Sequence, residues 1–441
     1  MTPTSRAQIL CTVVAVAALP ALVALAGPAA AGPRSAEPPP AESLPILGTL
    51  LPVPAAGPGT SVSVTAVDVN PLGVVAGTAN LVSTDPDRIQ SQSSVPLRWA
   101  QVPRVGWRRQ QLAMPAGAQF GTVAGVTNLG EAGGTVTTDG VSHAVRWSVT
   151  GRSLTSIGAN ASQVSAVGPN GPWGVDTPNE LNPIAGDTEL VTRSGERTLL
   201  SGTPDLGAGY RRTVISIGGP TTAIVGVTSG VGFGTRFTPV LWRAGATLTL
   251  PVFNSPFGIT HCESPVMADG SLSYSGLSIT GGVPEQILVR HVGGVPGQDV
   301  DLSRTGSGAY ATLGCQPGTV INDSLAADGG ISGSANDAQG GSLAAYWDAT
   351  NTRTTVPLEA GEASAYGAAV ATGRRMVIRS ETADHSTRLT FWHNGIRTPL
   401  AVPAGWRVNR VVKLTDRGLL VANLSDESGR VRPATWNLGR L

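Results

Sequence analysis

The sequence predicts an all-β fold: a single β-propeller of eight four-stranded blades, with seven blades as the alternative. Composition is the first reason. Of 441 residues, 57 are glycine and 33 proline, and only 13% are charged. Helical arrays need long runs rich in Ala, Glu, Lys and Leu, whereas this chain has one lysine, Lys413. Disordered chains are poor in apolar residues, but this one is 41% hydrophobic.

A recurring unit is the second reason. The unit has a β-branched strand, a tight Asn/Asp/Gly turn, a strand of small residues, a strand ending in tryptophan and a short fourth strand. The spacing from the first to the last of these tryptophans is about 48 residues per unit, and four short strands in such a length indicate a propeller. Two further units, around 189–200 and 286–302, lack the tryptophan. We expect these rings to pack between sheets: Trp99, Trp147, Trp242, Trp347, Trp392 and Trp436.

The two ends of the propeller segment form the third reason. The last unit stops at residues 436–441, before any fourth strand, whereas residues 45–52 resemble a fourth strand without a blade. We therefore expect this N-terminal strand to complete the last blade. Such a pairing closes the ring and leaves no exposed sheet edge at the seam.

The N-terminal region has the features of an export signal. Arg6 precedes an apolar run over 9–26, and Ala29–Ala31 supplies small residues for a peptidase. We expect 1–31 to be a signal peptide, 32–43 a Pro-rich leader and 44–441 the propeller. A retained membrane anchor is the alternative, but the run is broken by Pro20, so we expect a secreted protein without membrane insertion after cleavage.

Export and near-zero charge limit the partners. A net charge of +1 gives no electrostatic footprint for nucleic acid or an anionic membrane. In an oxidising compartment Cys262 and Cys315 are expected to form a disulfide between neighbouring blades, two free thiols being the alternative. The five histidines are scattered, so we expect no metal site, and no cofactor motif is present. We expect a monomer.

Part of the repeat resembles a known family. The run Ser142–Trp147 contains His143-Ala144, and a second unit contains Ile321-Asn322-Asp323 ahead of Trp347. These segments are similar to the HAF repeats of bacterial extracellular proteins. The resemblance covers about 46–441 and implies a secreted, propeller-forming repeat protein. It transfers no catalytic residues, so His143 is interpreted as structural.

Loop lengths distinguish the two faces of the expected propeller. The connections between strands two and three, and from strand four to the next blade, share one face and contain the long irregular segments. These segments are 79–94, 178–187, 201–211, 229–237 and 303–317. We expect this face to bind a ligand, a glycan or a protein. Its candidate residues are Asp85, Asp87, Arg88, Asp176, Glu180, Asp187, Tyr210, Arg211, Phe233, Arg236 and Tyr310.

Catalytic motifs are missing from the sequence. It has no Gly-x-Ser-x-Gly elbow, His-Glu-x-x-His, P-loop or EF-hand pattern. A non-catalytic binding module is therefore the first expectation. An extracellular glycan hydrolase or lyase using loop carboxylates such as Asp85 and Asp187 is the alternative, and a purely structural protein is the third possibility.

Overall fold

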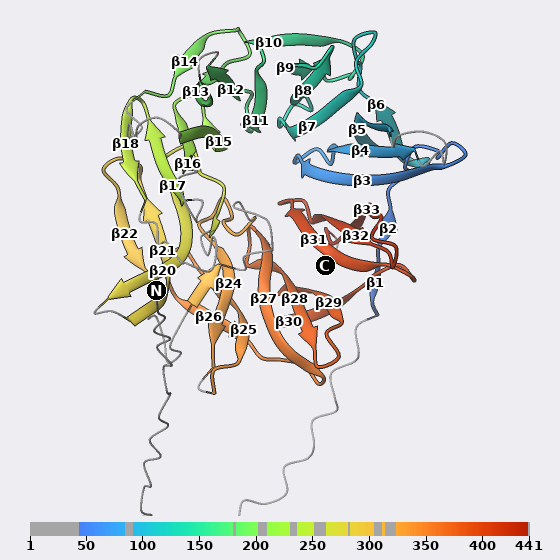
Figure 1. Cartoon of the computed structure of the whole chain (residues 1–441). Helices are drawn as coiled ribbons and strands as arrows, with labels where there is room; N and C mark the ends of the chain where they lie inside the picture. The colour runs from blue at the N-terminus through green and yellow to red at the C-terminus, as the bar shows by residue number, and fades with distance from the viewer. Residues whose placement is uncertain are drawn as a thin grey trace, which may run out of the picture. The chain divides into compact units, whose positions relative to one another are not determined.

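The computed structural model describes a single compact unit of β-sheets within Ser43–Leu441 (Figure 1). The described residues are 44–83, 91–179, 182–201, 210–229, 236–250, 262–280, 283–303, 311–313, 323–337 and 339–439. They contain 33 strands and no helix, so none of the described segments is an apolar helix able to cross a membrane.

The strands from β3 onward group, in chain order, into antiparallel units of four. The first four units are β3 (Thr60–Val69), β4 (Val75–Ser83), β5 (Ser91–Val102) and β6 (Gly106–Gln111); β7 (Phe120–Val126), β8 (Ala132–Thr138), β9 (Val141–Trp147) and β10 (Leu154–Asn160); β11 (Gln163–Val167), β12 (Trp173–Asn179), β13 (Asn182–Val191) and β14 (Arg197–Leu199); β15 (Tyr210–Gly219), β16 (Thr222–Ser229), β17 (Arg236–Arg243) and β18 (Ala246–Thr249). One parallel pair, Ser94 with Phe120, joins the first two units edge to edge.

The remaining units repeat this order. They are β19 (Cys262–Glu263), β20 (Leu272–Thr280), β21 (Val283–Val292) and β22 (Gln298–Asp301); β23 (Ala311–Leu313), β24 (Ile331–Asn336), β25 (Ser342–Trp347) and β26 (Arg353–Val356); β27 (Glu362–Ala371), β28 (Arg375–Thr382), β29 (Thr387–His393) and β30 (Ile396–Ala401); β31 (Arg407–Leu414), β32 (Leu419–Ser425) and β33 (Val431–Asn437) with β2 (Thr49–Leu50). The described strands therefore make eight four-stranded blades, which we number 1 to 8 in this order. The expected all-β propeller is confirmed.

The N-terminal strand closes the propeller as expected. β2 pairs antiparallel with β33, so it is the outer strand of blade 8. Leu51 N then donates to the Pro433 carbonyl at 2.9 Å. A second contact was not expected: β1 (Ile46–Leu47) adds a parallel fifth strand to blade 7 through β30. Figure 1 shows the N-terminal strands beside the C-terminal blades. The N-terminal segment thus joins both of the last two blades.

The core is divided into layers between neighbouring blades. Eight buried apolar clusters each join one blade to the next, and one of them joins blade 8 to blade 1 through Val421, Val64 and Leu51. The six repeated tryptophans are 0–3% exposed in these layers. Three of their indoles donate to the carbonyl that follows the outer strand of the preceding blade: Trp99 to Pro52 at 2.7 Å, Trp147 to Ala113 at 2.6 Å and Trp436 to Ala401 at 3.0 Å. In these three blades the tryptophan therefore joins a sheet to the preceding one.

The inner strands share a β-bulge. Six of the eight described inner strands shift register at the same place, for example between Ala66 and Asp68 in β3. A bulge of this kind increases the twist of a strand and turns a side chain aside. It also brings the Thr65 carbonyl against Gly77 of β4, where a Cβ would overlap it. In blade 1 the bulge thus leaves no room for a side chain at Gly77.

Side chains on the second strand link each blade to the next. Thr78 Oγ1 accepts from Val123 N at 3.0 Å, and Thr135 Oγ1 from Val164 N at 3.1 Å. At the same position of blade 8, Asn423 accepts from Ala66 N and donates to the Ala66 carbonyl, both at 2.8 Å. Each of these N–H groups directly precedes a bulge. We call this position the interblade link.

Deleting residues 44–52 should destabilise the fold by about 3 kcal/mol or more, since it removes buried Leu51 and the Pro52 and Leu51 carbonyls that accept from Trp99 and Arg432. Urea unfolding measures the change. Deleting 32–40 of the leader is the matched control and should leave the midpoint unchanged. Equal stability of the two deletions would contradict the closure.

Gly77→Ala should cost about 1–3 kcal/mol, because the added methyl group forces apart β3 and β4. Gly57→Ala is the control: its Cβ would lie 3.6 Å from Thr60 Oγ1, an ordinary contact. Thermal denaturation of both variants compares the two positions, and a neutral Gly77→Ala would show that the bulge does not need the glycine.

Candidate functional site

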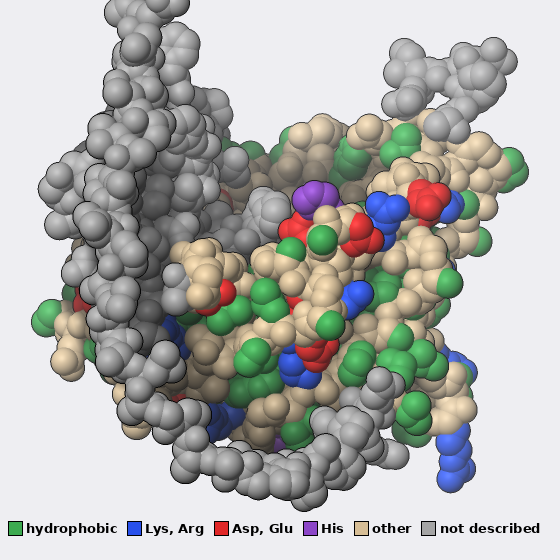
Figure 2. All heavy atoms as spheres, turned by 90° about the horizontal axis from the view of Figure 1, so that it is seen from below, with side chains coloured by type: hydrophobic (Ala, Val, Ile, Leu, Met, Phe, Trp, Pro, Cys, Tyr) green, Lys and Arg blue, Asp and Glu red, His purple; other side chains and the backbone are tan. Residues whose placement is uncertain are grey.

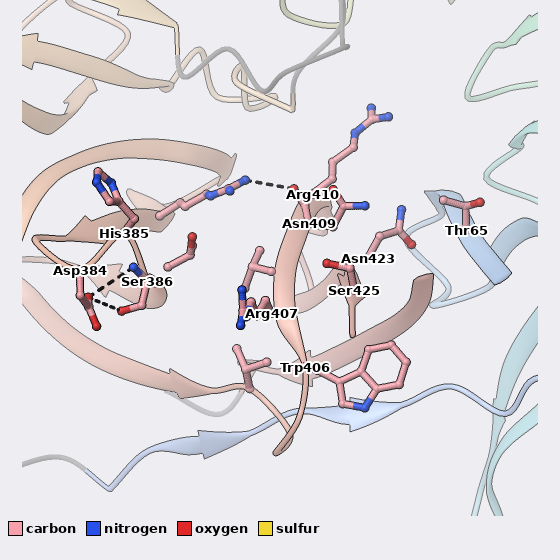
Figure 3. Close-up of a pocket in the computed structure, with 14 residues that line it drawn as sticks. Thr65, Asp384, His385, Ser386, Trp406, Arg407, Asn409, Arg410, Asn423 and Ser425 are labelled. Carbon is pink, nitrogen blue, oxygen red and sulfur yellow. Dashed lines mark hydrogen bonds between the residues drawn. The ribbon is translucent and has the colours of Figure 1, made fainter. Parts of the chain in front are cut away.

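A pocket of 820 Å³ lies between blades 7 and 8 (Figure 3). It opens where the β28–β29 and β30–β31 connections meet. The first connection joins strands two and three of blade 7, and the second joins blade 7 to blade 8. The pocket therefore lies on the face that the sequence analysis associates with the long connections. The lining residues are Thr65, Arg379, Asp384, His385, Ser386, Thr387, Val402, Trp406, Arg407, Val408, Asn409, Arg410, Asn423 and Ser425.

The pocket coincides with an altered interblade link. Counted from the residue that pairs with the repeated tryptophan, Arg379 of blade 7 takes the position held by Thr78 in blade 1 and Asn423 in blade 8. Arg379 is a donor, and its guanidinium donates to the Asn409 carbonyl of β31 at 3.1 Å. Blade 7 thus has a long cationic side chain at the interblade link, the position at which the other linked blades have a short side chain that accepts a hydrogen bond.

Two more arginines of the inner strand β31 line the pocket. The Arg407 side chain is exposed and that of Arg410 is half-buried. Burial lowers the pKa of Arg410 from its usual value. Its Nε is shielded from solvent and has no hydrogen-bond partner among the described residues. Arg410 therefore presents an unsatisfied donor at the pocket.

The β28–β29 turn forms one rim. Asp384 accepts hydrogen bonds from the Thr382 hydroxyl, from Ser386 Oγ at 3.0 Å and from Ser386 N at 3.3 Å. The Thr382 and Ser386 hydrogen bonds lower the pKa of Asp384. His385 has a positive φ of 61°, and its Nδ1 lies 2.7 Å from Glu381 Oε1. Asp384 and His385 thus interact within their own turn.

An aromatic ring lies at the opposite side of the pocket. Trp406, in the β30–β31 connection, packs partly against the cluster between blades 7 and 8 and remains partly exposed. In Figure 3 its indole lies below Arg407 and Ser425. Hydroxyl and amide side chains, including Asn409 and Ser425, also line the pocket. The pocket therefore combines cationic, neutral polar and aromatic groups.

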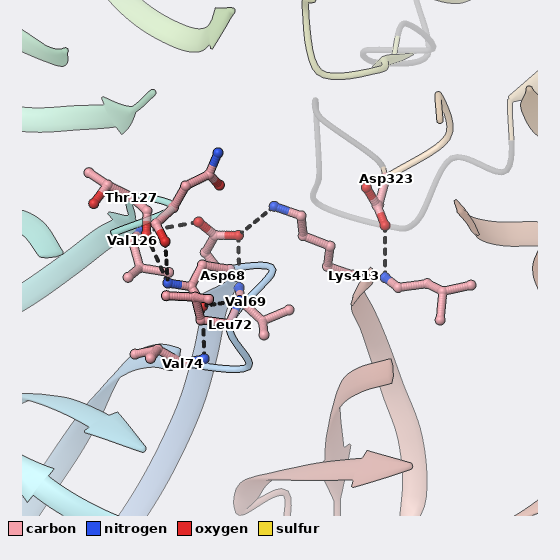
Figure 4. Close-up of polar contacts among 11 residues, drawn as sticks. Asp68, Val69, Leu72, Val74, Val126, Thr127, Asp323 and Lys413 are labelled. Carbon is pink, nitrogen blue, oxygen red and sulfur yellow. Dashed lines mark hydrogen bonds and ion pairs between the residues drawn. The ribbon is translucent and has the colours of Figure 1, made fainter. Parts of the chain in front are cut away.

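A second polar group bridges the inner strands near the other end of β31 (Figure 4). Lys413 Nζ lies 3.0 Å from Asp68 Oδ1, and Asp68 Oδ2 accepts from Val126 N at 3.1 Å. Asp323 Oδ2 accepts from Leu414 N at 2.8 Å, and its carbonyl accepts from Val370 N at 2.9 Å. Asp323 thus links blade 6 to both blade 7 and blade 8.

The charges in this group shift one another. Burial raises the pKa of Asp323 to about 7, against the opposing effects of Lys413 and the Leu414 N–H. Burial alone would lower the pKa of Lys413, but the carboxylates of Asp68 and Asp323 outweigh it and the pKa lies above its usual value. All three are engaged between blades, so we assign this group to ring stability.

Of the candidate residues, the side chains of Asp176 and Asp187 are described. Asp187 is exposed on β13, paired with Thr177 of β12. Asp176 is not a loop residue: it lies in β12, is 5% exposed, and accepts from the Thr213 hydroxyl and from Val214 N at 3.3 Å. It occupies the interblade link of blade 3, so the expectation of a loop ligand is corrected to a link between sheets.

The other candidates lie outside the described residues or have side chains outside them. These are Asp85, Asp87, Arg88, Glu180, Tyr210, Arg211, Phe233, Arg236 and Tyr310, together with the expected disulfide of Cys262 and Cys315. Within the described residues, no group of three or more His, Cys, Asp or Glu side chains is arranged to hold a metal ion.

Sequence reasoning missed the pocket residues, since it favoured long loops whereas the pocket is bounded by short connections. A usable signal was present: Arg379 is a cationic side chain at the position that holds Thr78, Thr135, Asp176 and Asn423 in the linked blades. A smaller pocket of 630 Å³ lies on blade 1, lined by Ser91, Gln92, Ser93, Val95, Gln111, Met114, Ala118 and Gln119.

Figure 2 shows acidic and basic side chains in small mixed groups on the face in view.

Comparisons with known proteins yield structures alone. No family model matches, and no curated protein matches. The β-propeller domain of the Trilobed protease from Pyrococcus furiosus is 10% identical, over 78% of this chain and 99% of that chain, with a TM-score of 0.41. A structure from a study of two prolyl endopeptidases is 12% identical, over 83% and 55%, with a TM-score of 0.44, and an acylaminoacyl peptidase from Pyrococcus horikoshii is 11% identical, over 83% and 58%, with a TM-score of 0.41. This chain thus spans just over half of each of the latter two chains.

The raised pKa of Asp323 predicts a pH-dependent stability. The folded state binds this proton up to about pH 7, whereas the unfolded chain releases it near the ordinary value of 3.8. The free energy of unfolding should therefore fall as pH rises through this window. In Asp323→Asn this fall should disappear, while Asp187→Asn, an exposed control, should keep it. Urea titrations at several pH values test this, and an unchanged slope in Asp323→Asn would contradict the assignment.

Proposed function

We propose that this chain is a secreted, non-catalytic propeller that binds a ligand through the face bearing the long connections, in the pocket between blades 7 and 8. The observation that carries the proposal is the pocket itself. It lies on that face, and its lining combines donors, hydroxyl and amide groups and an aromatic ring. Binding sites commonly have such a few converging polar groups in a concave surface.

The lining also favours binding over hydrolysis. A glycoside hydrolase needs two carboxyl groups about 5–10 Å apart. The described lining has one, Asp384, which accepts several hydrogen bonds from its own turn. Asp187 of the alternative pair lies on β13 of blade 3, away from the pocket. The glycan-active enzyme therefore remains the second candidate, resting on Asp85 and Asp187.

Trp406→Ala should weaken ligand binding by about tenfold or more, because a buried aromatic contact contributes on the order of 1–2 kcal/mol. A thermal-shift screen of residues 32–441 against neutral and acidic oligosaccharides, divalent ions and cell-wall fragments identifies the ligand, and calorimetry measures its affinity.

Trp107→Ala is the matched control for that experiment. Trp107 is also partly buried, but it lies in β6, where the strand follows a three-to-four turn on the opposite face. It should retain full affinity. Equal losses in the two variants would contradict binding at the pocket. Turnover of a polysaccharide, abolished by Asp187→Asn, would favour the enzyme.

A further inference from the structure

Two cations of the pocket, Arg407 and Arg410, have no acidic partner among the described residues. In the same two blades, Arg397 lies 2.7 Å from Glu362 and 3.0 Å from Glu359, and Arg430 lies 2.7 Å from Asp426. In contrast, neither Arg407 nor Arg410 has an ion pair within the described part of the chain.

The remaining charges do not cancel this excess. Asp384 is the one carboxylate of the described lining, and its oxygens accept hydrogen bonds within its own turn. Arg379 adds a third guanidinium, which donates to Asn409. Arg410 Nε is buried from solvent without a partner among the described residues. A guanidinium at a pocket prefers an oxyanion as its hydrogen-bond acceptor.

The neutral lining indicates what carries that oxyanion. Most other groups are hydroxyls and amides: Thr65, Ser386, Thr387, Asn409, Asn423 and Ser425. Trp406 offers a flat apolar surface, and the only other apolar residues of the described lining are Val402 and Val408. Polar groups around one aromatic ring suit a sugar, whose ring has an apolar face and a rim of hydroxyls. A peptide partner would call for more apolar contacts.

We infer that the pocket binds an acidic saccharide, with Arg407 and Arg410, which point in different directions from β31 in Figure 3, each contacting a carboxylate or sulfate group and Trp406 packing against a sugar ring. This inference rests on the proposed function and adds the class of ligand. Arginine suits the task because its planar guanidinium donates two parallel hydrogen bonds to a carboxylate or sulfate. Since these groups are near the surface, binding should weaken with salt.

Calorimetry with four probes tests the inference: trigalacturonate, its methyl ester, a chondroitin sulfate disaccharide and the peptide Glu-Glu-Glu. Trigalacturonate or the sulfated disaccharide should bind, and the stronger of the two identifies the oxyanion. The methyl ester keeps the size but not the charge of trigalacturonate. It should bind at least about tenfold more weakly than the favoured acidic saccharide.

Arg407→Gln and Arg410→Gln should each weaken that binding by about tenfold. Arg407 is exposed, so its replacement leaves the core intact. Arg417→Gln is the matched control, an exposed arginine in the β31–β32 turn of the same blade on the opposite face, and should bind as the unmodified protein does.

Three results would overturn the inference. They are equal affinity for trigalacturonate and its ester, unchanged affinity in Arg407→Gln, and binding of the peptide in place of the saccharides. Failure of all four probes would also overturn it. The proposed function fails separately, when a ligand from the wider screen binds as well to Trp406→Ala as to the unmodified chain.

Discussion

The pairing of β2 with β33 is the contact on which the rest of the structure depends. Each blade buries its apolar face against the next, and eight clusters share this burial around the propeller. The cluster between blades 8 and 1 needs Leu51, which follows β2. The same segment supplies the Pro52 carbonyl to Trp99 of blade 1. The N-terminal segment thus completes both the sheet of blade 8 and the apolar layer between blades 8 and 1.

The interblade link connects this architecture to the pocket. Short acceptors at Thr78, Thr135 and Asp176 hold a backbone N–H of the next inner strand, and Asn423 does so at the seam. Blade 7 replaces the acceptor by Arg379, which donates to Asn409 instead. The pocket opens beside this residue. The pocket and the altered contact thus coincide, while the apolar layer between blades 7 and 8 is retained.

Few side chains of this protein are charged, and several of the described ones form contacts between blades. The one lysine of the chain pairs with Asp68 between blades 8 and 1, close to Asp323 of blade 6. Arg397 and Arg430 of blades 7 and 8 have acidic partners, whereas Arg407 and Arg410 at the pocket have none among the described residues. Low overall charge makes such a local excess effective, because few neighbouring charges oppose it. The pocket is therefore where a charged ligand gains most.

The sequence by itself determined the repeat, the buried tryptophans and the strand at 45–52 that closes blade 8, because these follow from local periodicity and from counting strands at the two ends. Only the tertiary structure decided where a pocket opens. Arg379, Trp406 and Arg410 are far apart or unremarkable in the sequence, and they meet because blades 7 and 8 pack side by side. The structure also places Asp176 in a buried link between sheets, where a loop position was expected. Its partners Thr213 and Val214 belong to the next blade, so the contact is not visible in the sequence.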